Sequence, residues 1–244
     1  MFDVAVAVVA VIAGATAGVA GFGIGSLLTP LFAARYDTKL AVAIVSIPHL
    51  VATAYRFVTV REHVDRAVLI RFGVLSAIGG LVGALLNARV NGPAITIVFA
   101  VLLLFAGLSG VTGFAERMRF GRKTAWIAGA LSGLFGGMVG NQGGIRSAAL
   151  LGFEIPKESF VATATAIALV VDGARMPVYL VTQHSALAHA WMEILIATIG
   201  GIVGTMWGVQ VLHRIPEWIF RRSVGALILA LGIYMLAKGI AEVS

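Results

Sequence analysis

Hydrophobic residues follow one another in long stretches along this chain, and most charged residues lie in the short segments between them. A helix needs about 20 apolar residues to cross a hydrocarbon core of about 30 Å. Six stretches have roughly this length, and they cover residues 38–60, 67–88, 94–114, 158–181, 187–211 and 217–240. Two more stretches, 2–34 and 124–153, are longer. The pattern predicts an all-α integral membrane protein with about eight hydrophobic segments.

A cluster of glycines interrupts each of the two longer stretches. The first cluster reads GFGIG at 21–25, and the second reads GGMVGNQGG at 136–144. An unbroken helix of about thirty residues would be about 45 Å long, which exceeds the thickness of the hydrocarbon core. Glycine also destabilises the interior of a helix. We therefore expect each stretch to form two half-helices joined by unwound backbone at a glycine-rich knot.

The basic residues of the loops indicate how these segments cross the membrane. If all eight segments cross, eight loop or terminal Lys and Arg residues lie inside and seven lie outside. If the two broken stretches are re-entrant, eleven lie inside, and only Arg35, Lys39, Arg89 and Lys238 lie outside. Cytoplasmic loops carry an excess of Lys and Arg, so the second arrangement is favoured. It puts both termini outside and gives each half of the chain three crossings.

The two halves of the chain also resemble each other. The glycines at 14, 18, 21 and 25 match those at 129, 133, 136 and 140 with an offset of 115 residues. Tyr55 and Arg56 correspond to Ala174 and Arg175 at an offset of 119, and GGLVG at 79–83 corresponds to GGIVG at 200–204 at an offset of 121. Chance similarity between glycine-rich helices is the alternative explanation. The shared order of the matches favours two inverted repeats, at 1–114 and 124–244, joined by a basic cytoplasmic linker at 115–123.

Composition narrows the class of protein. Of the 244 residues, 59% are hydrophobic and 12% are charged, which is too few charges for the polar exterior of a soluble fold. The chain has no cysteine, so disulfides, thiolate metal sites and cysteine nucleophiles are excluded. Its net charge of +7 arises mostly in short loops that meet lipid headgroups, and nucleic acid is not an expected partner. No Lys or Arg precedes the first apolar run, so we expect no cleavable signal peptide and place the chain in a bacterial-type inner membrane.

The two glycine-rich knots are the first candidates for a binding site. Unwound backbone inside a bilayer is tolerated only where protein or a water-filled cavity satisfies its polar groups. A half-helix that starts at such a break presents free N–H groups and a positive dipole end, which suit an anion. The candidate substrate-binding residues are Gly23, Gly25, Ser26, Asn141, Gln142, Gly143 and Gly144. Tight packing of small residues is the alternative role for these glycines.

Arginines also lie within or near the ends of hydrophobic segments, where a charge usually faces a cavity or a partner. They are Arg56, Arg146 and Arg175. Arg175 is the strongest candidate for contact with an anion, and Arg56 is the next. Asp172 lies three residues before Arg175, so these two could instead neutralise each other. Arg56 could extend to the inner surface of the membrane.

His49 and Asp172 are the candidates for coupling transport to protons. His49 follows Pro48, which can kink a helix in the middle of a hydrophobic segment. A histidine at such a kink could bind substrate or carry a proton. A hydrogen bond from His49 to a neighbouring carbonyl group is the alternative.

Four stretches carry a resemblance to a known family. They are GVAGFGIGSLLTPLF, AYRFVTVREHVDRAVLIRFGVLSAIGGLVGALL, GLFGGMVGNQGGIRSAALL, and GARMPVYL followed by GGIVGTMWG and HRIPEWIFRRSVGALILALG. With these pieces in order over nearly the whole chain, the sequence resembles the TauE/SafE family of toluene-sulfonate uptake permeases and sulfite exporters. The resemblance implies a transporter of sulfur oxyanions or organosulfonates, in which 21–26 and 140–144 are the breaks close to the substrate.

These observations predict a secondary transporter that moves a small organosulfonate or sulfur oxyanion across the inner membrane by alternating access. The chain has no HExxH, serine elbow or Walker loop, so we do not expect an enzyme. A passive anion channel or facilitator is the alternative, and a membrane-embedded enzyme or assembly factor is a weaker one. No cofactor or metal is expected, and proton coupling and sodium coupling both stay open. The expected partners are a small anion and membrane lipid, and a homo-oligomer is compatible with the prediction.

Overall fold

The computed structural model describes residues 1–20, 23–90, 92–114, 122–150, 153, 155–212 and 216–243. This part of the chain is helical and contains no strand, which confirms the predicted all-α class. The first half contains α1 (Phe2–Ala20), α2 (Ile24–Ala33), α3 (Thr38–Val60), a 3-10 turn (Arg61–His63), α4 (Arg66–Val68), a π-helical turn (Leu69–Gly73), α5 (Val74–Arg89) and α6 (Gly92–Thr112). The second half contains α8 (Arg122–Val139), α9 (Gly143–Leu150), α10 (Lys157–Thr182), α11 (His184–His189), α12 (Trp191–Leu212) and α13 (Glu217–Ala241).

Five helical segments of the described chain are long and apolar enough to cross a membrane. They are Thr38–His63, Arg66–Arg89, Gly92–Thr112, Glu158–Thr182 and Trp218–Ala241. Shorter apolar helices occupy Phe2–Gly18, Ile24–Ala33, Trp126–Val139 and Trp191–Trp207. The segment predicted at 187–211 begins later, at Trp191, because the separate helix α11 takes up the chain as far as His189. These helices are those of a multi-pass integral membrane protein.

The first of the two longest apolar stretches folds as a helical hairpin, α1 and α2. Gly23, between the two helices, has a φ of 143°, which residues with a side chain rarely adopt. The ring of Phe2 at the start of α1 lies 5.9 Å from the ring of Phe32 near the end of α2. The hairpin therefore starts and finishes at the same end of the molecule. Gly21 and Phe22 of this knot lie outside the described residues.

The second long stretch folds in a similar way, as α8 and α9. Gly140 follows α8 with a φ of 73°, in the left-handed region that favours glycine. The ring of Trp126, near the start of α8, lies 6.0 Å from the ring of Phe153, just beyond α9. This hairpin also brings its two ends together.

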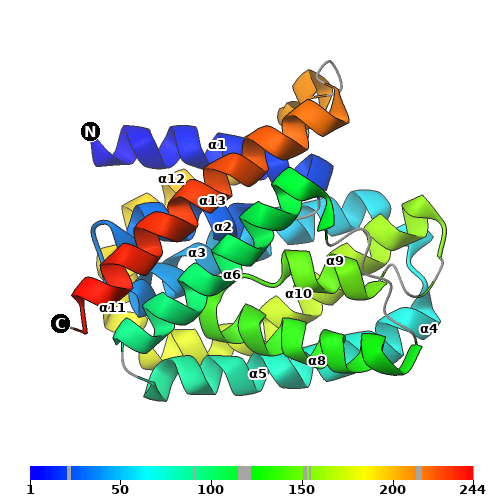
Figure 1. Ribbon diagram of the computed structural model, residues 1–244, viewed down its shortest axis with the longest axis horizontal. Helices are drawn as coiled ribbons and strands as arrows, with labels where there is room; N and C mark the ends of the chain where they lie inside the picture. The colour runs from blue at the N-terminus through cyan, green and yellow to red at the C-terminus, as the bar shows by residue number, and fades with distance from the viewer. Residues whose placement is uncertain are drawn as a thin grey trace.

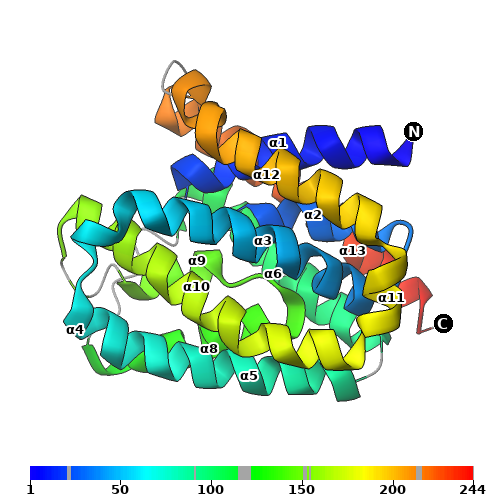
Figure 2. The same cartoon turned by 180° about the vertical axis from the view of Figure 1, so that it is seen from behind.

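Helices from the two halves pack on each other throughout the bundle. α1 packs on α12, α8 on α5, α6 on α13, and α3 on α10. Figure 1 shows α1 and α8 running in opposite directions along the long axis, and Figure 2 shows the same for α3 and α10. Both termini lie at one end of this axis, which we call the terminal end (Figure 1).

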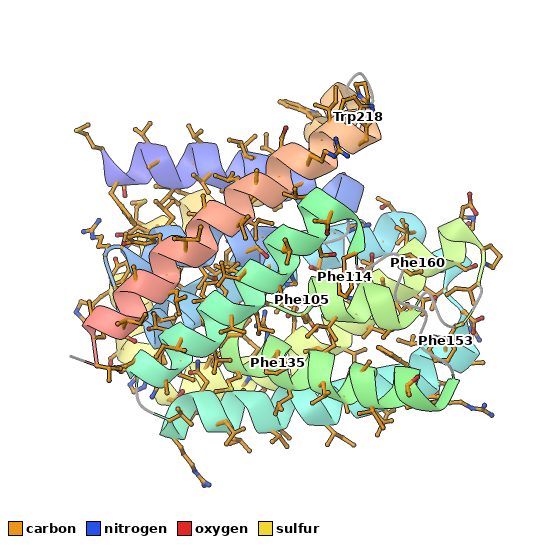
Figure 3. The ribbon with its side chains drawn as sticks, viewed as in Figure 1. Phe105, Phe114, Phe135, Phe153, Phe160 and Trp218 are labelled. Carbon is orange, nitrogen blue, oxygen red and sulfur yellow. The ribbon has the colours of Figure 1, made fainter. Side chains whose placement is uncertain are left out.

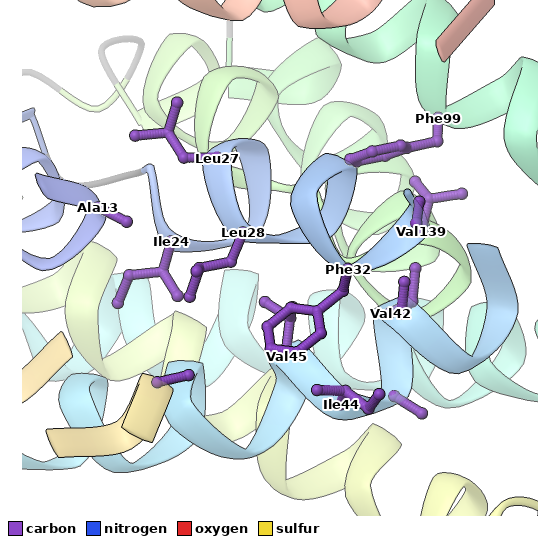
Figure 4. Close-up of a cluster of buried hydrophobic side chains, with 14 of the residues drawn as sticks. Ala13, Ile24, Leu27, Leu28, Phe32, Val42, Ile44, Val45, Phe99 and Val139 are labelled. Atoms are coloured by element: carbon purple, nitrogen blue, oxygen red, sulfur yellow. The ribbon is translucent and has the colours of Figure 1, made fainter. Parts of the chain in front are cut away.

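The helix α2 lies in the interior of the bundle. Nearly all of its residues are buried, because the other helices enclose this returning arm of the hairpin. Ile24, Leu28 and Phe32 contribute to the apolar core shown in Figure 4. Ser26 and Thr29 on the same helix are buried as well. Burying a hydroxyl costs free energy unless it finds a partner, so these two residues draw attention to their surroundings.

The outer surface of the bundle is apolar. Large hydrophobic side chains such as Val8, Ile78, Ile199 and Ile233 are more than half exposed, and they belong to four different helices. Figure 3 shows carbon-rich side chains projecting around the bundle, with Trp218 at one extremity. Monomeric soluble proteins rarely expose apolar surface on this scale, so lipid is the expected neighbour.

Candidate functional site

The two breaks meet inside the bundle. Gly25, in the first turn of α2, packs against the carbonyl group of Gly140, and a Cβ at Gly25 would collide with that oxygen. The adjacent residues also meet, because the Ser26 hydroxyl donates to Asn141 Oδ1 at 3.5 Å. Glycine at Gly25 therefore permits a close approach of two backbones that other residues would prevent.

A small cavity lies beside the breaks, between residues of α1, α2, α3, α9, α10 and α12. Its free volume of about 20 Å³ has room for about one water molecule. The cavity residues of α3 lie in the second half of that helix and those of α10 in the first half. On α3, which begins at the terminal end, these residues lie in the half of the helix away from that end (Figure 2). Its polar lining residues are His49, Thr53, Arg56, Arg146, Thr165 and Thr205.

Two arginines line this cavity. Arg56 of α3 donates from Nη1 to the carbonyl oxygen of Ala17, in the last turn of α1, at 2.6 Å. In the described part of the chain, Arg56 forms no ion pair with a carboxylate. Arg146 lies in the first turn of α9 and is only 3% exposed. Because an intramembrane charge is costly and usually functional, two guanidinium groups at one cavity indicate a site for negative charge.

His49, which lines the cavity, forms a connected polar chain with two residues behind it, Asp172 and Arg175. His49 Nδ1 lies 2.6 Å from Asp172 Oδ2, and Arg175 Nε and Nη2 lie 3.0 Å and 2.8 Å from Asp172 Oδ1. Arg175 also donates from Nη1 to the carbonyl oxygen of Gly136 at 2.7 Å. Asp172 is fully buried, and Arg175 is almost fully buried. All three nitrogens of the Arg175 guanidinium group are thus engaged, and this residue does not line the cavity.

The junction of the two breaks contains buried polar atoms that lack a hydrogen-bond partner within the described ranges. They are Thr29 Oγ1, Asn141 Nδ2, and both Nε2 and Oε1 of Gln142. Thr29 is fully buried, Gln142 is 3% exposed and Asn141 is 7% exposed. Buried polar groups in proteins nearly always have a partner, so the hydrogen-bonding capacity of these side chains is unused within the described ranges.

The structure brings part of the predicted site together. His49 and Arg56 line the cavity, and Gly25, Ser26 and Asn141 lie where the breaks touch. The other predicted residues at the breaks, which lie at the starts of α2 and α9, are Gly23, Gln142, Gly143 and Gly144. Substrate contact by any of these residues stays a prediction.

Four polar residues of the cavity were not among the predicted binding residues: Thr53, Arg146, Thr165 and Thr205. Arg146 had a signal in the sequence, since it is an arginine in an apolar stretch two residues after the second knot. The threonines had no such signal. Thr165 and Thr205 donate to carbonyl groups four residues earlier, as threonines do on many helices without any function.

Comparison with known proteins identifies the same family as the sequence motifs do. The family model described as Sulfite exporter TauE/SafE matches residues 6–235. No curated protein and no solved structure matches the chain. The family match begins in α1, ends in α13, and so includes both breaks and the whole cavity. The chain therefore belongs to the sulfite exporter TauE/SafE family of membrane transporters.

Proposed function

We propose that this protein is a secondary transporter that moves a small organosulfonate or sulfur oxyanion across the inner membrane. The observation that carries the proposal is the cavity beside the two breaks, where Arg56 and Arg146 present positive charge. Family membership supports a sulfur-containing substrate, because the matching family model is that of sulfite exporters. The planar guanidinium fork suits such an anion, since its N–H donors match two oxygens at once.

We further propose that the two halves are inverted repeats, and matched contacts support this. Arg56 donates to the carbonyl group of Ala17, and Arg175 donates to that of Gly136, each across 39 residues of chain. The two arginines are 119 residues apart, and so are the two carbonyl groups. The helices α2 and α9, and likewise α3 and α10, also begin 119 residues apart.

Close contacts made by glycines also recur at matching positions of the two halves. Gly107 of α6 packs on Leu229 of α13, while Gly232 of α13 packs on Leu104 of α6. Gly107 and Gly232 are 125 residues apart, and so are Leu104 and Leu229. This offset is six residues larger than 119, and six residues is the length of α11. The offset of 119 is four residues larger than the 115 of the first glycine motif, and the offset of 125 is four residues larger than the 121 of the GGLVG motif. Four residues correspond to about one helical turn.

Alternating access requires that the site opens to one side at a time. At the terminal end, the Tyr36 hydroxyl donates to Glu193 at 3.0 Å, and Arg35 lies 3.4 Å from the same carboxylate oxygen. These bonds link the loop after α2 to the start of α12. The cavity residues of α3 lie in the half of that helix away from this end. We propose that this conformation is closed towards the terminal end, which the positive-inside rule assigns to the outside.

We propose that His49 and Asp172 couple transport to protons. The His49 ring lines the cavity, its Nδ1 faces Asp172, and its Nε2 has no hydrogen-bond partner within the described ranges. If Nδ1–H donates to the carboxylate, Nε2 is the nitrogen that takes up a proton beside a bound anion. The other charged groups around this site are Arg175 on α10, Arg56 on α3 and Arg146 on α9. An anion near the ring favours its protonation, and protonation favours the anion by the same factor.

Counterflow in liposomes tests the transporter proposal and separates a carrier from a channel. Liposomes with the reconstituted protein are loaded with unlabelled sulfite, and uptake of labelled sulfite from outside is followed, with methanesulfonate, acetate and phosphate in parallel. A carrier exchanges its substrate, so labelled sulfite or sulfonate should accumulate transiently above its equilibrium level. Uptake without this overshoot would favour a channel, and no uptake of any sulfur anion would exclude the proposed substrate class.

A further inference from the structure

We propose that the transported anion binds Arg56 in the position that the carboxylate of Asp172 occupies on the matching residue Arg175. This inference rests on the proposed transport function and names the residues that hold its substrate. The ligand class is a small oxyanion, such as sulfite or an alkyl sulfonate, that can present an oxygen to two nitrogens of one guanidinium group.

Arg56 and Arg175 occupy matching places in the two halves. Each lies at the same distance from the first residue of its helix, α3 or α10. Each donates from Nη1 to a carbonyl group in the last turn of the first half-helix of its own half, α1 or α8. The distance is 2.6 Å for Arg56 and 2.7 Å for Arg175. Each guanidinium group is therefore held by an equivalent hydrogen bond from Nη1, so the surroundings of Nε and Nη2 can be compared between the two arginines.

The residue three positions before each arginine differs between the halves. In the second half it is Asp172, whose Oδ1 contacts both Nε and Nη2 of Arg175 at 3.0 Å and 2.8 Å. In the first half it is Thr53, whose hydroxyl lies 3.5 Å from His49 Nδ1. Within the described ranges, Nε and Nη2 of Arg56 have no carboxylate in the place where Arg175 has one.

The arginine that lacks an internal counter-ion is also the one that lines the cavity. Thr53 and Arg56 both line the cavity. Asp172 and Arg175 do not line it, and they are 0% and 1% exposed. An anion that enters the cavity can complete the pairing of Arg56 as Asp172 completes that of Arg175, because both would offer oxygen atoms to the same two nitrogens.

The remaining charges at the cavity favour an anion over a neutral ligand. Arg146 adds a second guanidinium group, and His49 adds a ring nitrogen, while the described residues of the lining include no carboxylate. The free volume has room for about one water molecule, so we expect the cavity to widen when the anion binds. The volume of the widened cavity sets how large an organic group the bound anion can carry.

The variant Thr53→Asp tests the proposal, because it gives the first half the counter-ion that the second half has. The introduced carboxylate should pair with Arg56 and occupy the proposed anion position. Binding of sulfite and methanesulfonate, measured by titration calorimetry, should weaken by more than about 100-fold, since like charges would meet in the site. Thr53→Asn is the matched comparison, because it adds similar volume without charge, so the difference in affinity between the two variants measures the effect of the introduced charge.

Arg56→Gln provides an independent arm, and it should weaken binding of the same anions by more than about tenfold. Wild-type affinity in a folded Thr53→Asp protein, or in Arg56→Gln, would overturn the binding site. Counterflow with the same proteins separates this proposal from the transport function. Exchange that persists in both variants would refute the site but keep the transporter, whereas anion binding by a wild-type protein that exchanges nothing would refute the transporter but keep the site.

Discussion

Each buried charge near the centre of the bundle has a different environment. Asp172 and Arg175 neutralise each other, Arg56 binds the carbonyl group at the end of a half-helix, and Arg146 lies at the start of another. Removing one partner of a buried ion pair leaves an uncompensated charge and costs about 3–5 kcal/mol. Asp172 and Arg175 therefore form a fixed structural unit.

The variant His49→Gln is expected to separate exchange from proton coupling. The glutamine amide can still donate to Asp172, but it cannot take up a proton. Counterflow of labelled sulfite should persist within about threefold of wild type. Accumulation driven by an imposed pH gradient, about tenfold per pH unit for one proton per anion, should disappear. His189→Gln, at an exposed position on α11, is the control. Gradient-driven accumulation that survives in His49→Gln would exclude His49 as the coupling residue.

For individual residues, the sequence reveals contacts within a helix better than contacts between helices. Asp172 and Arg175 are three residues apart on α10, and their suggested pairing is observed. The contact between Asp172 and His49 spans 123 residues and depends on how α3 and α10 pack. The threonines of the cavity could not be found for the same reason, because their spacing on each helix is ordinary.

Glycine sets the distance between the helices that join the two halves. Gly14 of α1 packs on the carbonyl group of Gly201 in α12, and Gly133 of α8 packs on that of Ser76 in α5. A methyl group at either position would overlap with backbone, so the helices would have to separate. Gly173 of α10 differs, since an added Cβ there meets nothing within 4 Å.

The variant Gly133→Ala is expected to destabilise the protein by about 1–3 kcal/mol, because it overpacks a helix contact. Gly173→Ala changes the same residue type in open space. It should leave stability unchanged or raise it by about 1 kcal/mol, since alanine favours helix over glycine. Thermal unfolding of both variants in one detergent measures the difference. Equal melting temperatures would contradict the role assigned to the close contact.

The positions of the helices follow from the sequence more readily than the register of the repeat. The apolar stretches are directly visible, and glycines with unusual φ values lie between the half-helices in both halves. The glycine motifs suggested an offset of 115 for the first helices, yet the helix starts differ by 119. Small residues recur every four positions on these helices, so a shift of one turn gives an equally good glycine match. The match between Arg56 and Arg175 gives the offset that agrees with the helix starts.

The distribution of charge along the whole molecule predicts its orientation in the membrane. The loop after α2, the start of α3, the end of α5 and the last turn of α13 lie at the terminal end (Figure 1). These segments carry the minority of basic residues in the charge count of the sequence, Arg35, Lys39, Arg89 and Lys238. The positive-inside rule therefore predicts that the terminal end faces outwards. The sequence alone is enough for this prediction, because the rule needs only the order of the loops and their basic residues.

Single cysteines test this orientation, and the native chain has no cysteine to interfere. Ser185→Cys on α11 should react with a membrane-impermeant maleimide in intact cells, because α11 lies at the terminal end (Figure 1). Glu62→Cys, in the exposed turn after α3, should react only after the membrane is made permeable. The reverse labelling pattern would mean that the terminal end faces the cytoplasm. Labelling of both variants in intact cells would contradict the location of these two positions on opposite sides of the membrane.

The pairing of helices across the two halves could not be predicted from hydropathy, and it has a consequence for synthesis in the cell. The bond from Thr205 of α12 to the carbonyl group of Gly14 in α1 joins positions 191 residues apart. At about 5–20 residues per second, a ribosome needs about 10–40 s to extend the chain from one position to the other. During this time, the face of α1 that packs on α12 lacks its partner helix. A nascent chain that stalls before α12 thus exposes an unpaired helix, which quality-control proteases can recognise.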